Sequence, residues 1–391
     1  MLKGKRMNNW KQSNIGDVVE IKYGKDHKIL NDGKYPLYGS GGIMRYVESF
    51  IYDKPSVLIP RKGSIENLFF TDKPFWSVDT LFWTKTDANK IDPRFLFYLL
   101  SCIKLSRFDE GSAIPSLTVK TLNEIVISYP ESLTEQIQIR KVLEKIDMKI
   151  ELLRQQNQTL EEMAQTLFKE WFVNFRFPGA GKMVDSELGM IPKGWEVKSI
   201  QEISDVAIGR TPPRKESEWF SIDKSDWKWV SIRDMGNSGI YISETAECLT
   251  KRAVVKFNVP IAKKGTILVS FKLTLGRINI ANEDLVTNEA IAHINLKSTN
   301  NLNAEFMYLF FKNFNFNSLG STSSIATAVN SQSIKRIELV IPTNDVLLKF
   351  KILINPLFSK IDNNSQQIQT LSQLRDRLLP KLMSGEIKVK M

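Results

Sequence analysis

The sequence predicts an α+β protein that arose by tandem duplication, with one long helix after each of two globular halves. The first observation is that residues 133–177 contain no Gly or Pro and carry apolar residues at alternating spacings of three and four. The second is that residues 346–386 repeat this pattern, and Lys145-Ile146-Asp147 returns there as Lys360-Ile361-Asp362. Such self-similarity indicates a repeated unit.

The helix in residues 133–177 has the heptad stripe of a helix that pairs with another helix. Its stripe consists of Ile139, Leu143, Ile146, Ile150, Leu153, Leu160, Ala164, Leu167 and Trp171. Asn157 interrupts this stripe. A buried amide there would set the register and orientation of the pair at some cost in stability. The alternative is an Asn at a frayed gap that faces solvent.

The second helix is the expected partner, because its stripe has the same spacing. That stripe consists of Ile354, Phe358, Ile361, Ile368, Leu371, Leu374 and Leu378. The first helix ends at the second half of the chain, so the pair forms most simply if the second helix runs back. We therefore expect an antiparallel coiled coil in a pseudo-two-fold molecule.

Further landmarks support the duplication. Asn9-Trp10 corresponds to Gly194-Trp195, Ser56-Val57-Leu58-Ile59 to Thr266-Ile267-Leu268-Val269, and Phe95-Leu96-Phe97 to Phe306-Met307-Tyr308. The interval between matching landmarks grows along the chain, so the halves share a framework and differ by insertions. We divide the chain into a first domain at residues 1–132, a central helix at 133–177, a second domain at 178–343 and a C-terminal helix at 344–391.

The composition is that of a globular protein, with 42% hydrophobic residues. Cys102 and Cys248 occupy non-equivalent places and are expected to be buried thiols of a reduced, intracellular protein. No apolar run reaches the roughly 18 residues of a membrane span, and the start lacks the apolar region of a secretory signal. We therefore expect a cytoplasmic protein without membrane contact, whose start is Met1 or Met7.

The net charge of +11 is spread over the chain, so a nucleic-acid surface must come from local arrangement of charges. In the first half, a loop begins near Lys22 and Lys25, and Tyr38 and Ser40 lie in a Gly-rich stretch that could meet a phosphate or a base edge. The alternative for this stretch is an ordinary hairpin turn. An apolar strand at residues 57–59 then leads to Arg61 and Lys62, for which the alternative is a solvated turn.

The second half repeats the pattern of a strand followed by cations and glycine, with Lys272 and Arg277 after residues 267–269. Cations also alternate with aromatic residues in a stretch that suits a surface for nucleic acid. These cations are Arg210, Arg214 and Arg233. Trp219 and Trp229 lie in the same stretch, and for them we favour a place in the core.

A search for catalytic motifs finds none. The two histidines, His27 and His293, lie in unrelated contexts, and no metal-binding Cys/His cluster, Walker loop or dinucleotide-binding glycine motif is present. Nuclease-like triplets such as Glu20-Ile21-Lys22 recur throughout this charged chain and carry little information. We therefore predict no catalytic residue and no metal site.

The landmarks resemble those of one family over essentially the full chain. They are Gly111-Ser112-Ala113-Ile114-Pro115-Ser116-Leu117, the stretch at residues 163–175, Ser186-Glu187-Leu188-Gly189-Met190-Ile191-Pro192, Gly265-Thr266-Ile267-Leu268-Val269-Ser270 and Leu275-Gly276-Arg277-Ile278. Their order and duplication resemble the specificity subunit of type I restriction-modification systems. Ser324-Ile325-Ala326-Thr327 departs from the pattern, because a Ser-Ile-Pro-like motif would be expected there.

The resemblance implies two tandem target-recognition domains that read double-stranded DNA, within a complex of modification (methyltransferase) subunits, expected to be two, and restriction (endonuclease and translocase) subunits. It implies that this chain binds no cofactor, and that S-adenosylmethionine, ATP and Mg²⁺ belong to the partner subunits. The exposed helix faces would dock the methyltransferase subunits. The expected DNA-contacting residues are Lys22, Lys25, Tyr38, Ser40, Arg61, Lys62, Arg210, Arg214, Arg233, Lys272 and Arg277.

The geometry of this arrangement predicts a bipartite target. A helix of about 36 residues spans roughly 54 Å at 1.5 Å per residue, which can hold two readers about one DNA turn apart. Because the two domains differ in sequence, the target should also be asymmetric. One competing hypothesis is a self-contained nuclease or methyltransferase. A methyltransferase would need an Asn-Pro-Pro-aromatic motif, and Asn355-Pro356-Leu357 is not one. The other is a coiled-coil scaffold that binds no DNA.

Overall fold

The computed structural model describes residues 10–111, 113–298, 301–319 and 330–389. The chain forms two compact units, one of Met1–Glu151 with Gln369–Met391 and one of Leu152–Ile368. The division passes through both long helices, α3 (Leu133–Phe168) and α9 (Asn344–Met383). Each unit therefore contains one globular domain together with part of each helix. Ser112 and the segment Ser324-Ile325-Ala326-Thr327 lie outside the described residues.

The first unit is built on two sheets, of order β2-β8-β5-β6 and β4-β3-β7. Their strands are β2 (Val19–Tyr23), β3 (Asp32–Gly39), β4 (Gly42–Val47), β5 (Ser56–Pro60), β6 (Phe69–Thr71), β7 (Trp76–Ser77) and β8 (Leu81–Thr86). An antiparallel pair, β1 (Trp10–Asn14) with β9 (Val126–Pro130), joins the start of the domain to its end. The helical elements are η1 (Ile15–Asp17), α1 (Pro93–Ser101), η2 (Leu105–Phe108) and α2 (Val119–Glu124).

The second unit contains two five-stranded sheets, of order β13-β22-β19-β20-β16 and β14-β17-β15-β21-β18. The strands are β13 (Ser204–Ile208), β14 (Phe220–Ser221), β15 (Trp227–Val230), β16 (Tyr241–Ile242), β17 (Glu247–Leu249), β18 (Ile261–Ala262), β19 (Ile267–Ser270), β20 (Ile278–Ala281), β21 (Leu285–Thr287) and β22 (Ile291–Leu296). Two antiparallel pairs accompany them, β10 (Met183–Val184) with β11 (Ile191–Pro192), and β12 (Glu196–Ser199) with β23 (Glu338–Ile341). The helical elements are α4 (Ile200–Ile203), η4 (Ser217–Trp219), α5 (Ile232–Asn237), α6 (Lys251–Lys256), α7 (Ala304–Asn313), η5 (Phe316–Leu319) and α8 (Ser331–Lys335).

The two units share a framework, as the duplicated landmarks predicted. In each, a first strand pairs antiparallel with a late strand, β2 with β8 and β13 with β22, and the late strand also pairs antiparallel with β5 or β19. The pair β1·β9 corresponds to β12·β23. The short helices η1 and α4 also begin in the same way. The carboxylate of Asp17 accepts from the backbone N–H of Asn14 at 2.9 Å, and that of Glu202 accepts from the backbone N–H of Ser199 at 2.7 Å.

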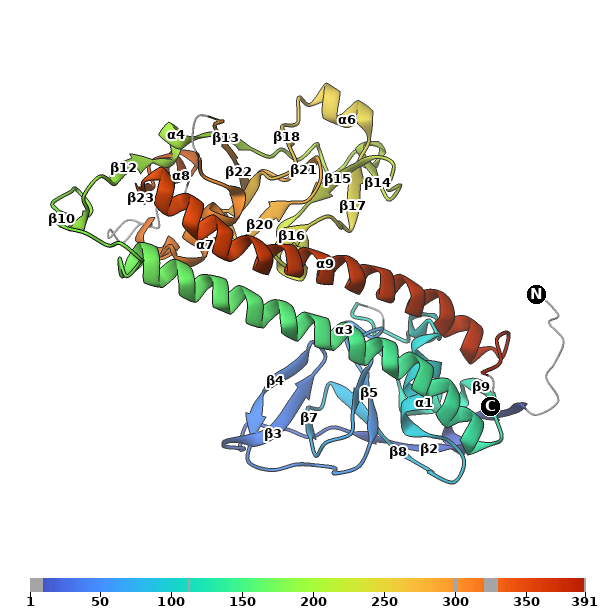
Figure 1. Ribbon diagram of the computed structural model, residues 1–391. Coiled ribbons are helices and arrows are strands. Elements are labelled where there is room, and N and C mark those ends of the chain that lie inside the picture. Colours follow the sequence, from blue (N-terminus) through green and yellow to red (C-terminus); the bar gives the residue numbers. More distant parts are fainter. Residues whose placement is uncertain (1–9, 112, 299–300, 320–329, 390–391) are drawn as a thin grey trace. The chain divides into compact units, whose positions relative to one another are not determined.

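The helices α3 and α9 are antiparallel, as predicted, and Figure 1 shows them side by side. In the second unit the Asn157 amide donates to Ser365 Oγ at 3.3 Å, while the Phe168 ring lies 6.2 Å from that of Phe350. Residue numbers thus rise along α3 as they fall along α9. The helix in 133–177 is shorter than predicted, because α3 ends at Phe168 and continues as the π-helical turn η3 (Lys169–Val173). Phe175 then adopts a φ of 54°, which turns the chain away.

Most of the predicted stripe is buried or half-buried, and it continues directly into the core of each domain. Ile139 and Leu143 belong to the core of the first unit, as Ile354, Phe358 and Ile361 do to that of the second. Ile150 and Leu153 are also buried, and Ile146, Leu160, Leu167, Ile368, Leu371 and Leu378 are half-buried. Leu374 differs from the prediction, because its side chain is 44% exposed. Ile368, Leu371 and Leu374 follow one another at two spacings of three, and at 3.6 residues per turn this places Leu374 about 120° around the helix from Ile368.

One cysteine also differs from the prediction. Cys248 is buried, but Cys102 is exposed because it follows the last residue of α1, where the chain turns out of the helix. Both are free thiols. Among the described residues, no helix is long and apolar enough to cross a membrane.

Candidate nucleic-acid interface

The predicted cations of the first unit gather at one edge of its four-stranded sheet. Because β2 and β5 are both antiparallel to β8, they run parallel to each other and their carboxyl ends share that edge. Lys25 follows β2, and Arg61 and Lys62 follow β5. The Arg61 guanidinium lies 5.3 Å from the centre of the Tyr23 ring, in the geometry of a cation–π contact. Tyr23, 53% exposed, is a member of this surface that the sequence did not indicate.

The backbone that carries Lys25 is held in place by close packing. A Cβ at Gly24 would overlap the Val78 carbonyl oxygen, so only glycine fits there. The Lys25 N–H donates to the Ser77 carbonyl at 2.8 Å, and its own carbonyl accepts from Trp76 Nε1 at 3.2 Å. The Lys25 side chain is therefore exposed on a fixed backbone.

The Gly-rich stretch is a β-hairpin turn, since Gly39 pairs with Gly42 across Ser40-Gly41. Tyr38, before the turn, is half-buried against Phe75, with 6.3 Å between ring centres. Burial raises the pKa of the Tyr38 hydroxyl, so it stays protonated. The stretch therefore forms a hairpin turn, and DNA contact by Tyr38 and Ser40 stays a prediction. Lys22 lies on β2 and forms an ion pair with Glu20.

The second unit has an equivalent arrangement at the edge of its sheet that contains β13, β22 and β19. β13 and β19 are both antiparallel to β22, so their carboxyl ends also lie together. Gly209 matches Gly24, because a Cβ there would overlap Thr287 Oγ1, and the next residue, Arg210, donates its N–H to the Thr287 carbonyl at 2.8 Å. Arg210 thus occupies the place of Lys25, and the exposed Lys272 after β19 that of Lys62 after β5.

Trp219 and Trp229 lie in the core, as predicted, with 2% and 3% of their surfaces exposed. Arg214 stacks against Trp229, 4.4 Å from the ring centre, and makes two hydrogen bonds to Glu247 of 3.2 and 2.8 Å. Two of its N–H donors are thus engaged within the domain. On α6, Lys256 lies 4.1 Å from the centre of the Trp219 ring, a cation that sequence reasoning missed.

The last two predicted cations lie at α5, with different exposures. Arg277 is half-buried, and its Nη1 donates to the Ile232 carbonyl beside Gly236, so it anchors the helix. Arg233 is exposed on α5, and no hydrogen bond or ion pair of its side chain is found within the described part of the chain. Of the two, Arg233 is the one placed to meet a ligand.

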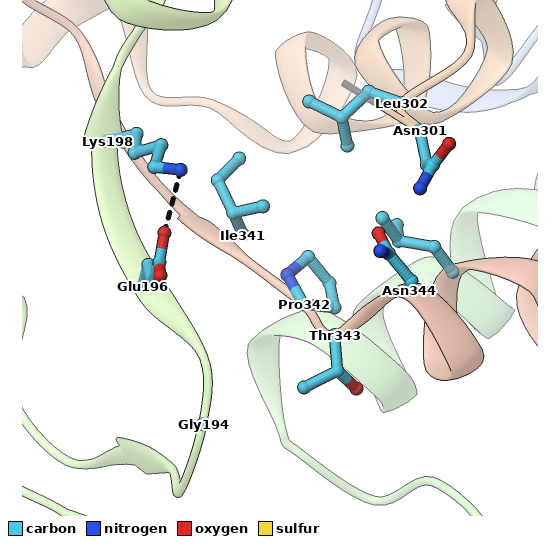
Figure 2. A pocket seen from close by; sticks show the side chains of 10 residues that line it. Gly194, Glu196, Lys198, Asn301, Leu302, Ile341, Pro342, Thr343 and Asn344 are labelled. Atoms are coloured by element: carbon cyan, nitrogen blue, oxygen red, sulfur yellow. Dashed lines mark ion pairs between the residues drawn. The ribbon is translucent and has the colours of Figure 1, made fainter. Parts of the chain in front are cut away.

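A cavity of about 380 Å³ lies elsewhere in the second unit, between β12, β23 and the start of α9. Figure 2 shows Lys198 and Glu196 directed toward each other on its wall, 2.7 Å apart. Because these two charges neutralise each other, the described residues of the cavity wall have no unpaired charge that could bind a charged ligand. Among the described residues, no group of three or more His, Cys, Asp or Glu side chains could hold a metal ion.

Comparisons with known proteins identify the architecture. The family model "Type I restriction modification DNA specificity domain" matches residues 7–162 and 192–373. The MjaIX specificity subunit of a type I restriction enzyme from Methanocaldococcus jannaschii is 28% identical, over 87% of this chain and 79% of its own length. The HindI specificity subunit from Haemophilus influenzae is 26% identical, over 84% and 85%. A crystal structure of a type I S subunit from M. genitalium has the same fold, with a TM-score of 0.58 at 17% identity, and the match covers 100% of this chain and 99% of that one.

Proposed function

The chain belongs to the type I restriction-modification DNA specificity family, and we propose that it reads an asymmetric, bipartite DNA target through its two domains. The observation that carries the proposal is the duplicated sheet edge, where Lys25 and Lys62 correspond to Arg210 and Lys272. Exposed cations at equivalent places can contact phosphates in the same way on both half-sites. The side chains around them differ between the domains, so the base sequences read should differ.

The chain itself is proposed to be a non-catalytic subunit. It would direct modification subunits, two in number, and restriction subunits to the target, and the exposed faces of α3 and α9 would dock the modification subunits. The complex would be an adenine methyltransferase and an ATP-dependent endonuclease, and S-adenosylmethionine, ATP and Mg²⁺ would be held by the partners. The protein would act in the cytoplasm, where the DNA lies.

The two kinds of DNA contact can be separated by substitution in the complex with the cognate modification subunit. Lys62→Ala should weaken binding to all duplexes alike and lower the salt dependence by about one ion, because a phosphate contact is lost. Arg233→Ala should cost about 1 to 3 kcal/mol and relax one position of the second half-site. Affinities are measured on the cognate duplex and on single-base-pair variants at several salt concentrations.

Lys11→Ala is the matched control, because Lys11 is an exposed cation on the separate β1·β9 pair. It should leave both the affinity and the salt dependence unchanged. Equal losses for Lys11→Ala and Lys62→Ala would contradict the proposed surface, since they would indicate a response to net charge alone.

A further inference from the structure

Leu273, in the loop between β19 and β20, has an unusual conformation and exposure. Its φ is 63°, in the left-handed region that branched and bulky side chains rarely adopt. Its side chain is 94% exposed. The Thr274 N–H donates to the Lys272 carbonyl at 2.7 Å, which closes a tight turn around Leu273. A large apolar side chain is thus held in solvent on a strained backbone.

The first unit shows that the fold requires this backbone conformation but not this side chain. The equivalent residue after β5 is Gly63, which has a φ of 81° and, like Leu273, follows an exposed lysine. Glycine adopts a left-handed φ without the steric penalty that leucine incurs. A Cβ added to Gly63 would meet no heavy atom within 4 Å, so this position faces open space in the first copy too. Leucine therefore gains nothing from packing within the domain.

The loop is also held firmly. Ser270, at its base, is fully buried, and its hydroxyl donates to the Thr274 carbonyl at 2.5 Å and accepts from the Arg277 N–H at 2.9 Å. The Gly276 N–H donates to the Ser270 carbonyl at 3.0 Å. These bonds hold the backbone of the loop, so little backbone entropy is lost when Leu273 meets a ligand.

We propose that Leu273 is a base-contacting, specificity-determining residue of the second domain, a role that rests on the proposed function. Lys272, exposed beside it, would contact a phosphate, and Leu273 would contact the apolar part of the bases, a thymine methyl group or an exposed base step. Strained residues that the fold does not need occur at functional sites. The first domain lacks this contact, because Gly63 has no side chain.

The test uses the complex of the full chain with its cognate modification subunit, and duplexes that carry the motif it methylates. Leu273→Gly removes the side chain and suits the backbone, so it should not lower the melting temperature. It should raise the Kd about tenfold and make one position of the second half-site degenerate in the methylated motif. Leu273→Met keeps an apolar side chain and should stay close to the parent. Ile222→Ala, at an apolar residue that is 85% exposed in another loop, should change neither property.

An unchanged Kd and motif for Leu273→Gly would overturn the inference, as would an unchanged motif with weaker capture of the modification subunit. These outcomes are distinct from failure of the proposed function. In that case the parent complex itself would produce no methylated motif with two parts.

Discussion

Among single residues, His293 is a buried titratable group in the second unit, in the sheet of order β13-β22-β19-β20-β16. Its side chain is fully buried on β22, and Nε2 lies 2.8 Å from Thr287 Oγ1. Nδ1 has no hydrogen-bond partner within the part of the chain that the structure describes. Burial lowers the pKa of His293 from 6.5 to about 4, because the protonated ring would be charged in an apolar core.

This pKa shift predicts that the second unit loses stability in acid. Between pH 6.5 and about 4 the unfolded chain binds a proton at His293 that the folded chain does not. The stabilisation is therefore complete above pH 6.5 and falls as the pH decreases, by up to about 3 kcal/mol for this residue. His293→Gln should reduce the slope of unfolding free energy against pH in this window. An identical slope for parent and variant would show that other groups cause the loss.

At the scale of elements, the helix pair contains a buried polar contact. Asn364 is fully buried, and its amide donates to Asn157 Oδ1 at 2.9 Å, while the Asn157 amide donates to the Ile361 carbonyl at 3.4 Å. Asn157 therefore faces α9 and does not lie in a frayed gap. Because α3 and α9 carry related stripes, apolar contacts alone would allow several registers, and the Asn pair favours one of them.

A double-mutant cycle tests this pair. Asn364→Leu should lower the unfolding free energy by about 1 to 3 kcal/mol, because Asn157 Oδ1 loses the amide that donates to it. Asn157→Leu combined with Asn364→Leu should recover that loss, since both amides are gone, but the sample should become heterogeneous in size-exclusion chromatography. Gln158→Leu, on the exposed face of α3, is the control and should be within about 0.5 kcal/mol of the parent. A homogeneous, monodisperse double variant would contradict a role in register.

The helices and the repeated framework were predictable from sequence because periodicity reports directly which face is buried. Leu374 differed from the prediction because it follows Ile368 and Leu371 at two successive spacings of three, which place it away from the buried face. The places of the candidate interface residues in the fold were predictable only in part. Lys62 and Lys272 each follow an apolar stretch that the sequence identifies as a strand, so their places were predictable. Contacts between residues far apart in the sequence decide that Arg277 anchors α5 and that Arg214 bonds to Glu247. Local sequence carries no sign of such partners.

At the scale of the whole molecule, the paired helices are proposed to set the spacing of the two half-sites. Seven residues inserted after Glu151 in α3 and seven after Ile368 in α9 would keep the stripe in phase and lengthen the pair by about 10 Å. The unread gap of the target should grow by about three base pairs, with both half-sites unchanged. Insertion in α3 alone should lower the melting temperature, because the stripes no longer match. An unchanged gap in the methylated motif would refute the role of the helices as a ruler.

We propose that this chain supplies sequence recognition and that its partner subunits supply the chemistry. Genome-wide adenine methylation tests it most directly, in a host without other such systems, with the chain expressed with and without its cognate modification subunit. We expect one asymmetric motif in two parts that appears only when both proteins are present. Methylation by this chain alone, or a motif that the modification subunit produces without it, would show that this chain is not the recognition subunit.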